Sequence, residues 1–114
     1  MNRRRVTTRM IRLSLVRSRI KLRILFALLD LGEASLADLA REARAKPAHV
    51  EGALFGDGVA FRTSTALVAL GLVRVRESVF SRTATLTPRG RSVATVWRRE
   101  STRATLGLAR HPHA

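Results

Sequence analysis

The chain has 114 residues, a hydrophobic fraction of 46%, a formal net charge of +14 and no cysteine. A chain of this length is typical of one domain, and its apolar content is too high for wholesale disorder. No apolar stretch is long enough to span a membrane, and basic residues interrupt any segment that could follow as a signal peptide. Without cysteine there are no disulfides or thiolate metal sites, which fits an intracellular, cytoplasmic protein.

The positive charge is concentrated at the two ends of the chain. Residues 1–23 contain nine basic residues and no acidic residue, and residues 82–114 contain seven basic residues and one acidic residue. Residues 24–81, by contrast, contain six basic and seven acidic residues. Such segregation favours a polyanionic partner over an anionic membrane surface, with a solvated basic surface as the alternative.

Residues 1–17 are predicted to form a basic N-terminal arm. Ile11, Leu13 and Leu15 alternate with polar residues. This alternation would suit a short edge strand, whereas the charge would equally suit a disordered arm.

Two helices are predicted next. The first begins after Ser18, ends at Gly32 and has apolar residues at helical spacing, namely Ile20, Ile24, Leu28 and Leu31. The second helix, over residues 35–43, is capped by Ser35, with Asp38 three residues later in a capping motif.

A third helix is predicted to open at Lys46-Pro47 and to run to Phe55, because proline is favoured in the first turn of a helix. Val50, Ala53 and Leu54 would form its inner face, leaving Ala48, His49, Glu51 and Gly52 outside. After the turn signal Gly56-Asp57-Gly58, Thr63 or Ser64 is predicted to cap a further short helix that ends at Gly71.

A β-hairpin and a last helix complete the prediction. Alternating apolar and basic residues predict a strand over 72–76, and a return strand is expected over 82–87. Thr87-Pro88 would then start a helix through about Arg103, followed by a frayed tail over 104–114.

Two short motifs point to a known family. The first comprises Leu67, Leu70, Gly71, Leu72 and Val73, and the second is the LTPRG string of residues 86–90. With the two preceding helices they resemble the winged helix-turn-helix family of DNA-binding domains, as found in MarR-like regulators and small archaeal winged-helix proteins. The resemblance implies an α+β fold over residues 18–103, with a helical core, a two-stranded β-hairpin wing and a C-terminal helix.

The resemblance also implies which residues contact DNA. In this family a recognition helix enters the major groove. Either residues 47–55 or residues 63–70 could be that helix, and we favour the first. Lys46, Ala48, His49 and Glu51 would then face the groove, with Arg44 and Lys46 on phosphates, His49 donating to a base edge and Glu51 accepting from cytosine. The alternative for His49 and for Glu51 is a solvated surface side chain.

Further DNA contacts are expected beside the recognition helix. Ser81 and Arg82 near the wing tip are candidates, as are Arg74 and Arg76, which could instead line a solvated strand face. Arg62, Thr63 and Ser64 are candidates for a second contact, although helix capping would explain Thr63 and Ser64 equally well.

The predicted function is that of a sequence-specific regulator that binds double-stranded DNA and needs no cofactor. A short apolar stripe on the last helix, formed by Val93, Val96 and Trp97, predicts a homodimer interface unless Trp97 packs within its own domain. No paired carboxylates, metal-ligand set or phosphate-binding glycine loop indicates an enzyme or a metal site. The alternative is a non-specific chromatin-coating or RNA-binding protein, and the scarcity of aromatic residues argues against single-strand binding.

Overall fold

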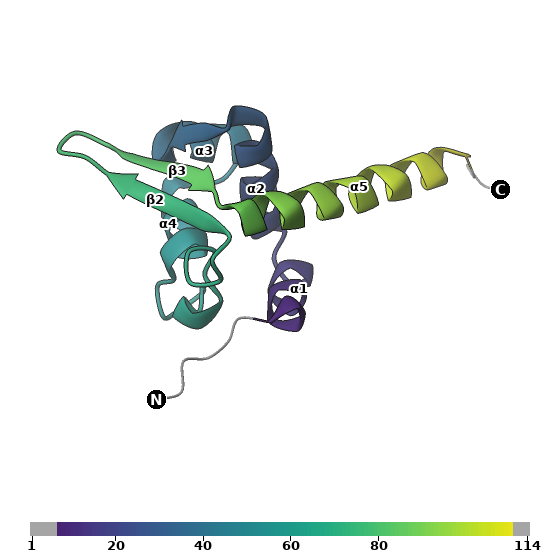
Figure 1. Ribbon diagram of the computed structural model, residues 1–114, viewed down its shortest axis with the longest axis horizontal. Coiled ribbons are helices and arrows are strands. Elements are labelled where there is room, and N and C mark those ends of the chain that lie inside the picture. Colours follow the sequence, from purple (N-terminus) through teal and green to yellow (C-terminus); the bar gives the residue numbers. More distant parts are fainter. Residues whose placement is uncertain (1–6, 111–114) are drawn as a thin grey trace.

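Helices and a small sheet alternate along the chain in the computed structural model, which describes the backbone of residues 7–110 and the side chains of residues 7–104. The elements in chain order are α1 (Thr8–Val16), α2 (Arg19–Leu31), β1 (Glu33–Ser35), α3 (Leu36–Ala43), α4 (Pro47–Phe55), the 3₁₀ turn η1 (Thr63–Thr65), β2 (Val73–Glu77), β3 (Arg82–Leu86) and α5 (Pro88–Arg110). The β2–β3 hairpin protrudes from one side of the helical body, and α5 leaves on the opposite side (Figure 1).

The local signals in the sequence explain where the first helices begin and end. Ser18 precedes α2 and accepts a hydrogen bond from the amide of Lys21, and Gly32 ends the helix at φ +77°. Ser35 caps α3 in the same way by accepting from the amide of Asp38 at 3.1 Å. Pro47 opens α4, as predicted. The Ser35 cap and the proline at the first position of α4 therefore mark where the two helices of the α3–α4 helix-turn-helix begin.

The sheet has three antiparallel strands in the order β1-β3-β2. Val73 pairs with Leu86 and Glu77 with Arg82, which confirms the predicted hairpin and places its turn at residues 78–81. The sequence analysis missed β1, whose Ser35 pairs with Thr83. Three residues are too few to show a strand periodicity, so β1 owes its conformation to pairing with β3 rather than to a pattern of its own.

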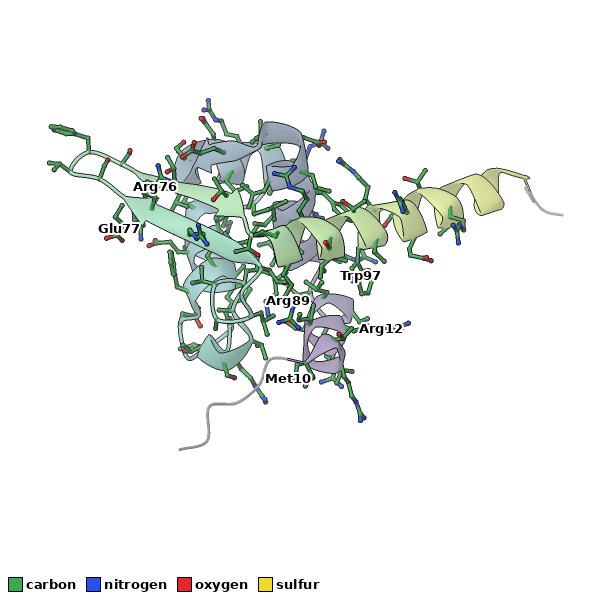
Figure 2. The ribbon with its side chains drawn as sticks, in the orientation of Figure 1. Met10, Arg12, Arg76, Glu77, Arg89 and Trp97 are labelled. Carbon is green, nitrogen blue, oxygen red and sulfur yellow. The ribbon has the colours of Figure 1, made fainter. Side chains whose placement is uncertain are left out.

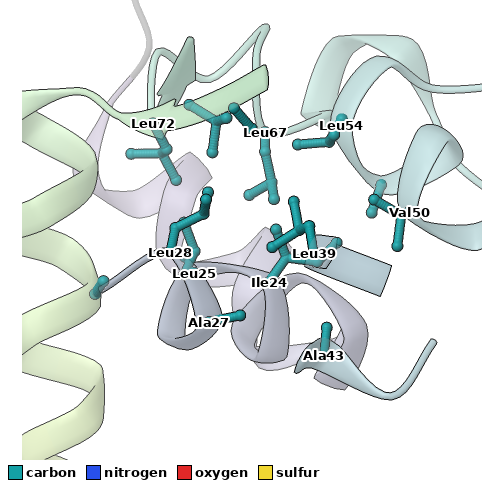
Figure 3. Close-up of a cluster of buried hydrophobic side chains, with 14 of the residues drawn as sticks. Ile24, Leu25, Ala27, Leu28, Leu39, Ala43, Val50, Leu54, Leu67 and Leu72 are labelled. Carbon is teal, nitrogen blue, oxygen red and sulfur yellow. The ribbon is translucent and has the colours of Figure 1, made fainter. Parts of the chain in front are cut away.

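The hydrophobic core lies where α2, α3, α4 and the start of β2 meet (Figure 3). Its largest fully buried side chains include Leu25 and Leu28 of α2, Leu39 of α3, Leu54 of α4, and Leu67, Leu70 and Leu72 from the segment before β2. Leucines far apart in the sequence thus fix the helix-turn-helix against the base of the hairpin.

The N-terminal segment differs from the predicted arm, because Thr8–Val16 form α1. Thr7 caps this helix by accepting from the amide of Met10 at 3.1 Å. Ile11 and Leu15, four residues apart, are buried, whereas Leu13 is exposed. Helical spacing therefore outweighs the alternation that suggested an edge strand. Residues 1–6 lie outside the described residues.

The last helix also extends beyond its predicted end. α5 begins at Pro88, as predicted, but continues through Arg110 instead of ending near Arg103. No proline occurs between Pro88 and Pro112, and the single Gly107 costs a helix only about 1 kcal/mol relative to alanine. The predicted frayed tail is therefore helical over residues 104–110, and residues 111–114 lie outside the described residues.

The start of α5 is joined tightly to the start of the hairpin. The Thr87 hydroxyl donates to the carbonyl of Gly71 at 2.6 Å, and the Thr87 amide donates to the carbonyl of Leu72 at 3.1 Å. Gly90 lies so close to Leu72 that a Cβ atom on Gly90 would collide with the backbone carbonyl of Leu72. Because the colliding atom belongs to the backbone, no rotamer change relieves the contact.

We therefore expect Gly90→Ala to lower the free energy of unfolding by about 1–3 kcal/mol, the usual cost of overpacking a close contact. Urea denaturation of both proteins measures the difference. Ser92→Ala, at an exposed position on the same helix, is the matched control and should leave the stability unchanged. Equal stability of Gly90→Ala and the parent chain would contradict the close packing of α5 on Leu72.

Lys21 is the charged residue that is buried within the described core, with 5% of its surface exposed. Its ammonium group donates to the Ser14 hydroxyl and to the carbonyl of Thr65, both at 2.8 Å, but it has no carboxylate partner among the described residues. Burial lowers the pKa of Lys21 below its ordinary value of 10.5. Lys21 thus ties α1 and α2 to η1 at a desolvation cost.

This burial predicts a pH dependence of stability. With its pKa lowered in the folded state, Lys21 binds protons more readily in the unfolded chain, so its desolvation cost falls as pH rises through the folded pKa toward 10.5. The stability of the parent chain relative to Lys21→Met should therefore increase between pH 7 and 10 in urea denaturation. The exposed Lys46→Met variant is the control and should show no such trend. If the stability difference between the parent chain and Lys21→Met stays constant with pH, the lowered pKa of Lys21 is refuted.

Candidate nucleic-acid interface

The outer face of α4 presents the residues predicted to face the major groove. Lys46, Ala48, His49 and Glu51 are all exposed. Gly52, predicted to lie outside, is instead buried, because the Phe61 ring packs where a Cβ atom of residue 52 would lie. Only glycine admits the ring this closely. Phe61 also packs near His49, and the centroids of the two rings are 6.3 Å apart.

The segment after α4 is not the helix predicted over residues 63–70. Only Thr63–Thr65 form a 3₁₀ turn, and Ala66 is extended. The amides of Leu67 and Val68 donate to the carbonyls of Ala53 and Leu54 at 2.9 and 3.0 Å. Residues 57 and 58 would bond these carbonyls if α4 simply continued. The chain therefore leaves α4 for a ten-residue excursion over 57–66 and returns to satisfy its end, which competes with formation of a separate helix.

The excursion is held in shape by its own hydrogen bonds. The Asp57 carboxylate accepts from the amides of Val59 and Phe61 at 2.8 and 2.9 Å. Hydrogen bonds from Phe61 and Val59 lower the pKa of Asp57 below its ordinary value. The loop thereby fixes the Phe61 ring against α4, although its own Val59 remains exposed.

The structure places Arg62, Thr63 and Ser64 at the other end of α4 from Arg44 and Lys46. They are exposed but lie beyond the C-terminal end of α4, whereas Lys46 lies at its N-terminus. The nine residues of α4 span roughly 14 Å. Arg62 lines a hollow of about 670 Å³ together with residues of α1 and α2, and no residue of the wing lines this hollow. Their role as second-site DNA contacts stays a prediction.

Basic side chains of the wing lie on the solvent side of the hairpin. Arg74 and Arg76 alternate along β2 with Val73 and Val75, and both arginines are exposed. Figure 2 shows Arg76 and Glu77 toward the outer end of the hairpin. Neither Arg74 nor Arg76 forms an ion pair with any residue in the described part of the chain. Both guanidinium groups are available to phosphates.

Arg82 joins the wing to α4. Its Nη2 donates to Oε1 of Glu51 at 2.6 Å, and its guanidinium lies 5.7 Å from the centroid of the Phe55 ring. We call the contact between Glu51 and Arg82 the α4–wing latch. Two residues predicted to contact DNA separately are thus paired with each other. Sequence reasoning missed the latch because 31 residues separate its partners.

A second arginine–carboxylate pair holds α5 on α2. Arg98 donates to both carboxylate oxygens of Asp30, at 2.6 and 2.8 Å, and its guanidinium lies 5.5 Å from the Phe26 ring centroid. These hydrogen bonds lower the pKa of Asp30 and raise that of Arg98. Phe26 and Phe55 are therefore half-buried rings that each lie beneath an arginine.

The predicted dimer stripe lies along a groove between α1 and α5. Val93 and Trp97 are half-buried against the core, whereas Val96 is exposed. The groove has a volume of about 550 Å³ and is also lined by Ile11 of α1. Trp97 therefore packs within its own chain and also borders this groove (Figure 2).

Over the described residues, no helix is long and apolar enough to cross a membrane. In the same part of the chain, no three histidine, aspartate or glutamate side chains gather in a group that could hold a metal ion.

Three antiparallel strands, a helix-turn-helix and a protruding hairpin define a winged-helix fold of the MarR type, as predicted. The model of the EarA-like family matches residues 11–96. The chain therefore belongs to the EarA-like family. No curated protein matches the sequence significantly.

Solved structures share this fold. BpsR of Bordetella bronchiseptica, whose DNA binding is regulated by 6-hydroxynicotinic acid, is similar with a TM-score of 0.64 at 23% identity, over 91% of this chain and 74% of BpsR. The MarR family regulator SPO1453 of Silicibacter pomeroyi gives 0.54 at 23% identity, over 81% of this chain and 62% of that one. ZitR of Lactococcus lactis gives 0.53 at 16% identity, over 82% and 67%.

The α4–wing latch can be tested by a double-mutant cycle. The Glu51 and Arg82 side chains are 51% and 38% exposed, so solvent screens the pair. We expect a coupling free energy of about 0.2–1 kcal/mol between Glu51→Ala and Arg82→Ala in urea denaturation. Arg76→Ala, on the same hairpin but without an ion-pair partner in the described chain, should be additive with Glu51→Ala. Additivity of Glu51→Ala with Arg82→Ala as well would show that the latch does not form in solution.

Proposed function

We propose that this protein is a transcriptional regulator that binds duplex DNA and reads its sequence with α4. The observation that carries the proposal is the common surface formed by the exposed face of α4 and the basic hairpin, which the α4–wing latch holds together. An α-helix fits the major groove of B-DNA, and a hairpin beside it reaches the neighbouring backbone or minor groove.

The residues of this surface divide into two roles. Arg44 and Lys46, at the turn before α4, contact phosphates and supply affinity without sequence information. Ala48 and His49 face the base edges, where His49 donates a hydrogen bond and the Ala48 methyl group can contact a thymine methyl. Arg74, Arg76 and Ser81 bind the backbone beside the wing. Glu51 and Arg82 orient the wing, and they reach a base or phosphate only by releasing one another.

We further propose that the active form is a homodimer. A single domain of this size makes few base contacts, and two copies read two half-sites. The exposed Val96 and the groove between α1 and α5 form the contact, since they lie away from α4 and the wing. Chemistry beyond binding is not part of this function, and the protein needs no cofactor for it.

A non-specific, chromatin-coating function is the second candidate. It is favoured by the nine basic residues without an acidic residue in the first 23 positions, because phosphate contacts alone bind any duplex. Such binding requires no particular side chain on the groove-facing side of α4.

Titration of fluorescent genomic duplexes, including the region upstream of the protein's own gene, against random duplex at two salt concentrations separates the two functions. We expect a preference of about a hundredfold or more for at least one fragment, preserved at the higher salt. On that fragment, His49→Ala should reduce the preference by about 1 kcal/mol, roughly fivefold. Lys46→Ala should weaken binding to every duplex alike and reduce the salt dependence by about one phosphate contact.

Ser64→Ala, at the opposite end of α4, is the matched control and should bind as the parent chain does. Equal affinity for every duplex, falling steeply with salt, would contradict the sequence-specific function and support the chromatin-coating function. Absence of duplex binding at low salt would exclude both.

A further inference from the structure

The tip of the wing carries two large apolar side chains in water. Val79 is 91% exposed and Phe80 is 96% exposed, and they are neighbours in the turn between β2 and β3. No residue in the described part of the chain covers either one. Leaving a phenylalanine in water forfeits the stabilisation that its burial would give, so Phe80 adds no burial energy to the fold.

The turn that carries these side chains is closed by hydrogen bonds. The amide of Ser78 donates to the carbonyl of Ser81 at 2.8 Å, and the amide of Ser81 donates to the Ser78 hydroxyl at 3.1 Å. Val79 and Phe80 therefore project from an ordered turn. Little conformational entropy is lost when such a tip enters a binding site.

The tip lies close to the α4–wing latch. Arg82, the residue of the α4–wing latch, follows Phe80 by two positions, which corresponds to roughly 7 Å along a strand. The hairpin extends away from the helical body on the side opposite α5 (Figure 1). When α4 lies in a major groove, the tip is thus the part of the wing that extends farthest along the duplex.

The surroundings of the tip suit a nucleic acid. The exposed Arg76 precedes the turn, and the hydroxyl groups of Ser78 and Ser81 flank the apolar pair. Glu77 is the acidic residue next to the turn, and its cross-strand neighbour is the cationic Arg82. Minor-groove proteins combine cationic side chains with apolar wedges that unstack base pairs.

We propose that Phe80, with Val79 beside it, enters the minor groove as an apolar wedge, partly unstacks one base step and bends the duplex. The inference rests on the proposed DNA-binding function and specifies what the wing does within it. Two side chains on a narrow turn cover far less than the roughly 800 Å² per partner of a stable protein interface, but they suffice for one base step. Pyrimidine–purine steps, which unstack most easily, are the preferred sites.

Energy transfer between dyes at the two ends of a bound 30-base-pair duplex tests the wedge. The best-bound fragment of the genomic titration serves as the probe, with saturating parent chain, Phe80→Ala or Phe80→Leu. We expect the parent chain to bend the duplex by roughly 20–90°, and Phe80→Leu to retain most of that bend. Phe80→Ala should still bind but leave the duplex nearly straight, and its thermal midpoint should be unchanged because the side chain is exposed.

Val59→Ala is the matched control, since Val59 is an equally exposed apolar residue in the loop beyond α4, away from the wing. It should bend DNA as the parent chain does. A straight duplex with the parent chain, or an unchanged bend with Phe80→Ala, would overturn the wedge while leaving the regulator intact. Loss of self-association in Phe80→Ala with an unchanged bend would assign the tip to a second copy instead. If the parent chain binds no duplex, the proposed function fails and the wedge with it.

Discussion

Two backbone hydrogen bonds, from the amides of Leu67 and Val68 to the carbonyls of Ala53 and Leu54, tie the C-terminal end of α4 to the segment that leads into the wing. Carbonyls at the end of a helix lack partners, and leaving them buried and unsatisfied would be costly. The returning chain satisfies them and in the same step places Leu67 and Leu70 in the core. These contacts therefore set the position from which the chain continues through Gly71 into the wing.

The wing and α4 therefore form one surface although they are separate elements. Thr87 and the close approach of Gly90 to Leu72 fix the base of the hairpin. The α4–wing latch fixes the hairpin beside α4. Because both latch side chains are partly exposed, the latch is a weak constraint, whereas the base of the hairpin is held by backbone contacts. The hairpin is thus held firmly at its base and less firmly toward its tip.

Much of this architecture could be predicted from short-range signals. Ser18, Ser35 and Pro47 mark helix starts, and the alternation along β2 marks the wing, because each signal acts within a few residues. The N-terminal segment was predicted wrongly. Ile11, Leu13 and Leu15 fit an alternating pattern as well as helical spacing, and only the burial of Ile11 and Leu15 decides between the two.

Thr63 was predicted as a helix cap, but the amides of Leu67 and Val68 after it donate to the end of α4 instead. Contacts such as Glu51 with Arg82 depend on the tertiary fold and leave no local signal. The assignment of individual residues to DNA contacts stays a prediction.

The central claim, that DNA lies against the N-terminal half of α4 and the wing, is tested most directly by site-specific photo-crosslinking. A photoreactive amino acid is placed singly at His49, at Ser81 or at Ser64, and the crosslinked nucleotides of a bound duplex are mapped. The account predicts crosslinks to major-groove base edges from position 49, to the adjacent minor groove or backbone from position 81, and none from position 64. Crosslinks from position 64 without any from position 49 would place the DNA at the opposite end of α4 and contradict the account.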